Sequence, residues 1–178
     1  MTRYIALLRG INVGGHRVKM DELRRLFEEL GLSRVETVIA SGNVVFETAE
    51  TDARRLEHDI ERHLARALGY EAPTFLRTVP ELAGVAAQKH FDLSREPEGS
   101  VVYVLFLRDR PGAGVVKALR ELDTANDEAR AGKREVYWLR RGRVKDSDVF
   151  GAKLGALLGT EVTSRNLNTV QRIVEKYK

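Results

Sequence analysis

The sequence predicts an α+β protein: two ferredoxin-like (βαββαβ) halves packed together, plus a C-terminal helix. Three observations lead to this fold class. Strand-like and helical patterns follow one another as strand, helix, strand, strand, helix, strand. The same order returns after a short linker, without a letter-by-letter repeat. Finally, the strands expected at 4–8 and 101–107 are apolar on both faces, whereas a sheet with one face in water alternates apolar and polar residues.

The first half, residues 1–79, is expected to contain four strands, at 4–8, 35–40, 44–47 and 74–77. Its first helix has apolar residues spaced i, i+3, i+4 and i+7, namely Leu23, Leu26, Phe27 and Leu30. Gly31 ends that helix. A second helix extends from Asp52 to Gly69, with an apolar residue at every fourth position. Ser41-Gly42-Asn43 supplies the hairpin between the second and third strands.

Residues 80–100 are expected to form a short helix, which begins at Pro80, and a linker. The second half, residues 101–178, has strands expected at 101–107, 128–131, 135–139 and 161–164. Helices are marked by Val115, Leu119 and Leu122, by Phe150, Leu154, Leu157 and Leu158, and by Leu167, Val170, Val174 and Tyr177. Burying a Val, Leu or Phe side chain contributes about 1.5–3 kcal/mol. The two halves are therefore expected to cover each other's open sheet faces.

Composition limits the class of protein. The chain has 178 residues, of which 43% are hydrophobic, and no cysteine, which excludes disulfides and thiolate metal sites. No apolar run approaches the roughly 18 residues of a membrane helix, and the first residues show no signal-peptide pattern, so a cytoplasmic location is expected. Lys and Arg number 14 in residues 1–100 against 16 Asp and Glu, and 16 against 10 in residues 101–178. The basic excess therefore lies in the second half, and it is densest at 140–145.

The segment from Gly10 to Arg17 has the glycine spacing of a phosphate-binding loop, G-x-x-x-x-G. A nucleotide hydrolase would continue with Lys and Ser or Thr, but His16 and Arg17 stand there, which argues against that activity. Backbone N–H groups of a glycine-rich loop before a helix can still bind an anion. The candidate ligand-binding residues are Asn12, Gly14, Gly15 and Lys19, and His16 is a further donor. The alternative is that the glycines only permit a tight turn.

A second junction, Thr163 to Thr169, is expected to open the last helix. Asn166 is a candidate N-cap, and Arg165 beside a helix N-terminus can hold a carboxylate or phosphate. Arg165 and Asn166 therefore complete the candidate ligand-binding set. The alternative is a capped helix whose arginine pairs with a neighbouring acid. The sequence leaves open whether the two junctions share one site.

The leading hypothesis is thus a binding protein for a small anionic ligand, such as a nucleotide or a phosphorylated metabolite. No cofactor, metal site or membrane partner is expected; no catalytic motif is present, so the sequence does not decide whether the protein is an enzyme. One alternative is a nucleic-acid-binding module that uses the basic second half. Such a module needs exposed aromatic residues on its strands, and only Tyr4 and Phe46 are available. Another is a structural or protein-interaction role.

Three stretches carry a resemblance: Tyr4 to Gly15 with Val18-Lys19-Met20, Ser41 to Phe46, and Thr163 to Val170. With them, the chain resembles a bacterial family known only as domain of unknown function 1697. The resemblance implies a two-part α+β fold with ferredoxin-like halves. It implies no reaction, cofactor or catalytic residue. Members of that family often carry an aromatic residue where this chain has Leu167.

Overall fold

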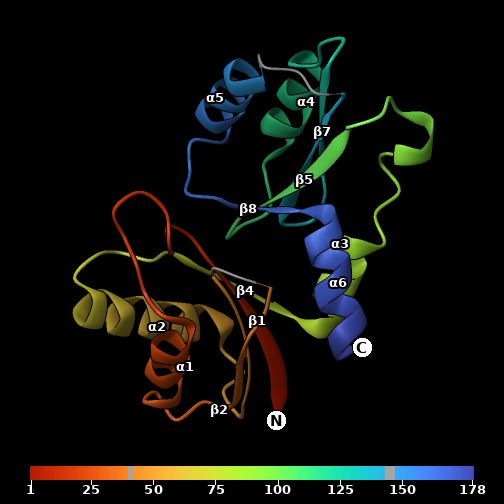
Figure 1. The fold of residues 1–178 in the computed structure, drawn as a ribbon. Coiled ribbons are helices and arrows are strands. Elements are labelled where there is room, and N and C mark those ends of the chain that lie inside the picture. Colours follow the sequence, from red (N-terminus) through yellow and green to blue (C-terminus); the bar gives the residue numbers. More distant parts are fainter. Residues whose placement is uncertain (40–41, 143–146) are drawn as a thin grey trace. The chain divides into compact units, whose positions relative to one another are not determined.

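The computed structural model describes residues 1–39, 42–142 and 147–178. The chain forms an α+β protein that divides into two compact units (Figure 1). The first unit comprises Met1–Ala83 together with Ile173–Lys178, and the second comprises Gly84–Arg172. Each unit contains one four-stranded antiparallel sheet, so the expected two-part α+β class is confirmed.

The first unit is built around a sheet with the strand order β2-β3-β1-β4. From the N-terminus, the elements are β1 (Thr2–Leu8), α1 (Met20–Glu28), β2 (Ser33–Thr37), β3 (Asn43–Thr48), α2 (Ala53–Leu68), β4 (Thr74–Thr78) and α3 (Val79–Ala86). Helix α2 begins where the Asp52 carboxylate accepts a hydrogen bond from the Arg55 N–H, and it ends at Gly69, whose φ is 79°.

The second strand is shorter than the sequence pattern predicts. The sequence predicts a strand at 35–40, whereas β2 begins at Ser33 and ends at Thr37; position 40 lies outside the described residues. Ile39 adopts a left-handed conformation with a φ of 48°, which an extended strand cannot include. The Asn43 side chain donates to the carbonyls of Val38 and Ile39 at 3.1 and 3.3 Å, which stabilises the bend. The apolar sequence pattern therefore extends beyond the residue at which the backbone leaves the strand, which is why the predicted strand ends too late.

The core of the first unit lies between the sheet and helices α1 and α2. From the sheet, Tyr4, Ala6, Leu8, Val44 and Phe46 join a buried cluster with residues of these helices, among them Leu23, Phe27, Ile60 and Leu64. The residues of the opposite sheet face are also buried: Ile5, Leu7, Val45 and Phe75 are all at most 2% exposed. The prediction that the first strand is buried on both faces is confirmed.

The last residues of the chain belong to the first unit, and polar contacts hold them there. The Tyr177 hydroxyl donates to Glu36 Oε2 at 2.7 Å, and Lys176 Nζ donates to the same oxygen at 3.0 Å. The Arg3 guanidinium lies 5.9 Å from the centroid of the Tyr177 ring. The hydrogen bonds from Tyr177 and then Lys176 lower the pKa of the Glu36 carboxyl.

These contacts predict a pH effect. A carboxyl whose pKa is lowered in the folded state stabilises the protein above its unfolded pKa, and the contribution is lost as the pH falls through the folded pKa. For Glu36 the loss is expected below the ordinary value of 4.5. Glu36→Gln should therefore melt below the wild type at neutral pH, and the gap should close in acid. Thermal melts of both proteins across that range test this; a gap independent of pH would contradict it.

The second unit repeats the arrangement with the strand order β6-β7-β5-β8. Its elements are η1 (Leu93–Arg95), β5 (Val101–Phe106), α4 (Ala113–Glu121), β6 (Asp127–Ala131), β7 (Glu135–Arg140), α5 (Ser147–Leu158), β8 (Thr163–Asn166) and α6 (Leu167–Tyr177). Helix α6 continues into the first unit. Figure 1 shows α4 and α5 beside each other on one side of this sheet. Among the described residues, no helix combines the length and apolar character needed to cross a membrane.

The core of the second unit lies between its sheet and helices α4 and α5. Leu105, Leu119, Val136, Phe150 and Leu154 form its centre. Trp138 lies at the edge of this cluster, where its indole N–H donates to Asp127 Oδ1 at 2.8 Å. A Cβ atom at Gly151 would lie 3.3 Å from the Trp138 ring, so α5 approaches the indole closely because residue 151 has no side chain.

Candidate functional site

The glycine loop (residues 9–19) connects β1 to α1 and is tied by its own polar groups. Asn12 adopts a left-handed conformation with a φ of 56°, and its Oδ1 accepts a hydrogen bond from the Val18 N–H at 2.8 Å. The His16 N–H donates to the Val13 carbonyl at 3.1 Å. Ile11 and Val18 are buried, whereas residues 13–17 are exposed. The loop is thus anchored at both ends, and its middle faces solvent.

Backbone donors in the middle of the loop are open. Gly14 has a φ of 58°, and a Cβ atom at Gly14 or Gly15 would meet no atom within 4 Å. The N–H groups of these two glycines bind no other group in the described part of the chain. The Asn12 side chain uses its oxygen for Val18, which leaves its amide N–H groups as further donors. Several hydrogen-bond donors therefore lie in the same segment of the loop.

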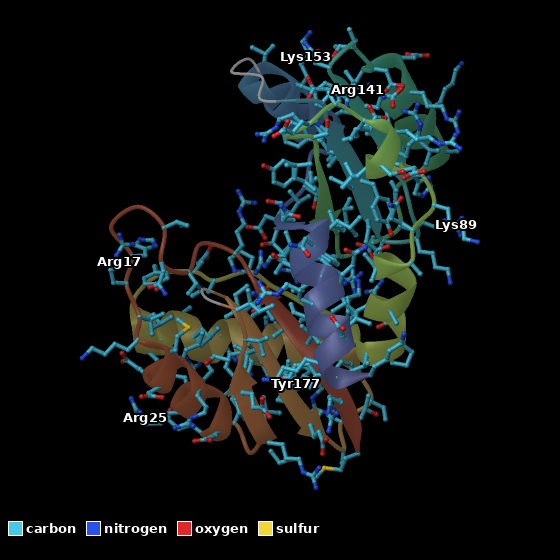
Figure 2. The ribbon with its side chains drawn as sticks, turned by 45° about the vertical axis from the view of Figure 1, so that its right-hand side comes forward. Arg17, Arg25, Lys89, Arg141, Lys153 and Tyr177 are labelled. Atoms are coloured by element: carbon cyan, nitrogen blue, oxygen red, sulfur yellow. The ribbon has the colours of Figure 1, made fainter. Side chains whose placement is uncertain are left out.

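Three basic side chains accompany these donors. Arg9, Arg17 and Lys19 are exposed, and none forms an ion pair with a carboxylate in residues 1–39, 42–142 or 147–178. Among the described residues, Arg17 donates to the His16 carbonyl alone, at 3.0 Å, and Figure 2 shows it on the outer part of the loop. Two acids, Asp21 and Glu22, occupy the first turn of α1, where they stabilise its N-terminus. The cations still outnumber the carboxylates here.

One aromatic contact holds the middle of the loop. The His16 imidazole stacks on the Tyr70 ring with centroids 3.8 Å apart and an interplanar angle of 15°. Tyr70 follows α2, and its hydroxyl is buried without a hydrogen-bond partner among the described residues. Burial raises the pKa of this phenol, and the charge of Glu22 raises it further. Tyr70 was not among the residues selected from the sequence, because its proximity to the loop arises only in the folded chain.

The second junction contains the expected strand and the start of the last helix, with the strand shifted by two residues. Residues 163–166 form β8, paired antiparallel with β5, in place of the expected range 161–164, and the last helix begins at Leu167, directly after the candidate N-cap Asn166. The Asn166 Oδ1 accepts from the Asn168 N–H at 2.9 Å, which confirms Asn166 as the N-cap. Arg165 donates to Thr163 Oγ1 and to the Ser164 carbonyl, both at 2.8 Å, and burial lowers its pKa to about 10.

Four of the six predicted ligand-binding residues lie in one loop. Asn12, Gly14, Gly15 and Lys19 share the glycine loop of the first unit, whereas Arg165 and Asn166 belong to the second unit. At the predicted hairpin, Ser41 lies outside the described residues, and Asn43 is buried and bonded within the turn. Asn43 is therefore a structural residue of that turn.

A groove in the first unit was not predicted. Its volume is about 330 Å³, its floor includes Leu30, Leu32 and Leu56, and its rim includes Arg55, Asp59, Arg62, His63 and Arg66 of α2. The positions of the arginines, which are seven and four residues apart, place them on one helix face, so the spacing was a usable signal. Arg62 pairs with Asp59 at 2.8 Å, and Arg55 lies 3.9 Å from both Glu50 and Asp59. Much of the arginine charge is thus balanced within the groove.

The features that favoured nucleic-acid binding have other contacts. Tyr4 and Phe46 are 5% and 0% exposed, and their rings stack on each other within the core, so neither can stack on a base. Arg141, labelled in Figure 2, donates to Glu96 at 2.7 Å and to Glu128 at 2.8 Å. These carboxylates raise the Arg141 pKa and balance its charge. Residues 143–146 of the basic run lie outside the described residues.

Comparisons with known proteins place the chain beside uncharacterised relatives. The family described as "Protein of unknown function (DUF1697)" matches residues 1–137. A solved structure, that of conserved bacterial protein SP0830 from Streptococcus pneumoniae, is similar with a TM-score of 0.76 and 27% identity, over 99% of both chains. No curated protein matches the chain. The descriptions name neither a ligand nor a reaction.

Proposed function

The chain belongs to the family of proteins of unknown function DUF1697, and we propose that it is a binding protein for a small anionic ligand, a nucleotide or another phosphorylated metabolite. The glycine loop is the proposed site. The observation that carries the proposal is the set of exposed cations in this loop that have no carboxylate partner in the described part of the chain. Cations left unpaired around open backbone donors suit a phosphate group.

The residues of the glycine loop contribute to ligand binding in different ways. The N–H groups of Gly14 and Gly15 donate to phosphate oxygens, since neither binds another group in the described part of the chain. The Asn12 amide adds a donor while its oxygen keeps the loop closed. Lys19 supplies a positive charge directly before α1. Arg165 and Asn166 are retained as a candidate position for an anion in the second unit, to be tested separately.

We also infer that each half is a ferredoxin-like module. In that fold the order βαββαβ gives an antiparallel sheet in which the first and third strands are central. The orders β2-β3-β1-β4 and β6-β7-β5-β8 support this assignment, because β1 and β3, and likewise β5 and β7, are the central pairs. The glycine loop is then the connection from the first strand of the first module to its first helix.

A thermal-shift screen with nucleotides and phosphorylated metabolites tests the binding function. A ligand that binds only the folded protein should raise the melting temperature by about 5–10 °C when present at about 100 times its Kd. Lys19→Ala should weaken binding about tenfold, since a hydrogen bond to a charged group is lost. Lys117→Ala removes an equally exposed lysine from α4 and serves as the charge-matched control.

The variants separate the two candidate positions. Equal affinity of Lys19→Ala and Lys117→Ala for a hit would remove the glycine loop from the proposal. Arg165→Lys keeps the charge and loses the planar fork, so a loss of affinity in this variant alone would assign the ligand to the second unit. A screen without any hit would overturn the proposed function.

Nucleic-acid binding is the second candidate, favoured by the basic excess of residues 101–178. It requires an affinity for RNA or single-stranded DNA that falls steeply with salt concentration. Filter binding at low and high salt measures this. An absence of binding at low salt would exclude it.

A further inference from the structure

The side-chain contact between His16 and Tyr70 consists of ring stacking, without a hydrogen bond between the two side chains among the described contacts. The two rings lie nearly parallel, 3.8 Å apart at their centroids. His16 is exposed, and its ring nitrogens bind no other group in the described part of the chain. Two glycines precede it, so the backbone that carries it is the most adaptable of the loop. The imidazole can therefore leave Tyr70 without breaking a side-chain hydrogen bond.

The Tyr70 hydroxyl is buried and lacks a hydrogen-bond partner among the described residues. A buried tyrosine hydroxyl normally has a hydrogen-bond partner, because leaving it unpaired is unfavourable. Within the described residues this hydroxyl has no hydrogen-bond partner, and its oxygen is shielded from solvent. Tyr70 thus offers a ring that already accepts a stacked planar group, and a donor for which the described residues provide no partner.

We propose that the His16 ring holds the place of a planar ring of the ligand, so that the glycine loop binds a nucleotide rather than a sugar phosphate or free phosphate. This inference rests on the proposed function. When the ligand binds, its base stacks on Tyr70, His16 turns outward, and the Tyr70 hydroxyl donates to an acceptor of the ligand. The phosphate lies at Gly14 and Gly15, which directly precede His16 in the chain.

The position of the His16 ring determines whether His16 strengthens or weakens nucleotide binding. In the free protein, stacking of His16 on Tyr70 occupies the base position, so it competes with the ligand and lowers its apparent affinity. Removing the imidazole should therefore strengthen nucleotide binding. This gain should be larger for a nucleotide than for a phosphate compound without a base. A histidine that served as a direct ligand contact would show the opposite effect.

Titration calorimetry with adenosine 5′-monophosphate and ribose 5-phosphate tests the proposal, because the two probes share the phosphorylated ribose and differ by the base. The wild type should bind the nucleotide about tenfold more tightly, the range that base stacking on an aromatic ring provides. His16→Ala should widen this ratio. Tyr70→Leu should abolish it.

Tyr70→Phe is the matched variant, since it keeps the ring and loses the hydroxyl. It should keep most of the ratio and melt no lower than the wild type, because the unpaired hydroxyl is removed. If Tyr70→Leu does not fold, the His16→Ala ratio decides.

Equal affinities of the wild type for both probes would overturn this inference and leave the proposed function in place. A ratio that His16→Ala lowers would likewise overturn it. If neither probe, nor any other phosphate compound of the screen, binds, the proposed function fails together with it.

Discussion

Phe46→Ala is expected to lower the free energy of unfolding of the first unit by about 3–5 kcal/mol. The Phe46 ring is fully buried, with its centroid 5.9 Å from that of Tyr4 and 5.7 Å from that of Phe27. Its removal leaves a cavity between the sheet and α1 that the surrounding residues fill only partly. Urea denaturation followed by far-ultraviolet circular dichroism measures the change. Val13→Ala, at a side chain that is 57% exposed, should shift it by less than about 0.5 kcal/mol.

Phe46→Ala also distinguishes this protein from an RNA-recognition module. In an RNA-recognition module, the aromatic residue on the third strand faces solvent and stacks on a base. Its replacement would cost RNA affinity and little stability. In this protein Phe46 faces the helices, so the loss should be one of stability. An unfolding free energy within about 1 kcal/mol of the wild type would contradict the buried position of this ring.

Asn12→Ala is expected to lower the free energy of unfolding by about 2–5 kcal/mol. The substitution removes the oxygen that accepts from the buried Val18 N–H, an effect of about 1–3 kcal/mol. It also places a Cβ-bearing residue without a local side-chain hydrogen bond at a φ of 56°, which costs about 1–2 kcal/mol. Asn12→Gly loses the oxygen but tolerates the backbone, so it should be less destabilised by about 1 kcal/mol. Thermal or urea denaturation of the series measures both contributions.

Asn12→Asp separates the two roles of this residue. It keeps an acceptor for Val18 and should fold with near wild-type stability, since aspartate also tolerates a left-handed backbone. It replaces the amide donor by a carboxylate, which repels an anionic ligand at Gly14 and Gly15. A variant that is stable and binds less tightly would support both roles. If Asn12→Asp binds the ligand as the wild type does, the Asn12 amide takes no part in the site.

Much of the fold was readable because it follows from short-range patterns. Strand β1 was recognised since five consecutive apolar residues from Tyr4 to Leu8 have no other stable location than between two covered faces. Helix α2 was bounded correctly by Asp52 and Gly69, whose effects on a helix end are local. One of the errors occurs where a distant contact decides. The range 161–164 shifted to 163–166 because pairing with β5, not local preference, sets the limits of β8.

The candidate site shows the same division. Asn12, Gly14, Gly15 and Lys19 were identified from glycine spacing and side-chain type, which are properties of one short segment. His16 was recognised only as a donor, because its stacking partner Tyr70 is separated from it by the whole of α1, β2, β3 and α2. The arginine face of α2 was equally readable as a spacing, but a groove requires Leu30 and Leu32 beside it.

The amino-acid order by itself therefore determined where most strands and helices lie, that β1 is buried on both sides, and which loop is rich in glycine and potential donors. Periodicity and backbone preference act over a few residues, so they can be read without the fold. Only the tertiary structure decided what each polar or aromatic group contacts. It assigned the Asn12 oxygen to Val18, directed Phe46 inward and placed His16 on Tyr70, because these contacts depend on strand pairing and helix packing between residues far apart in the chain.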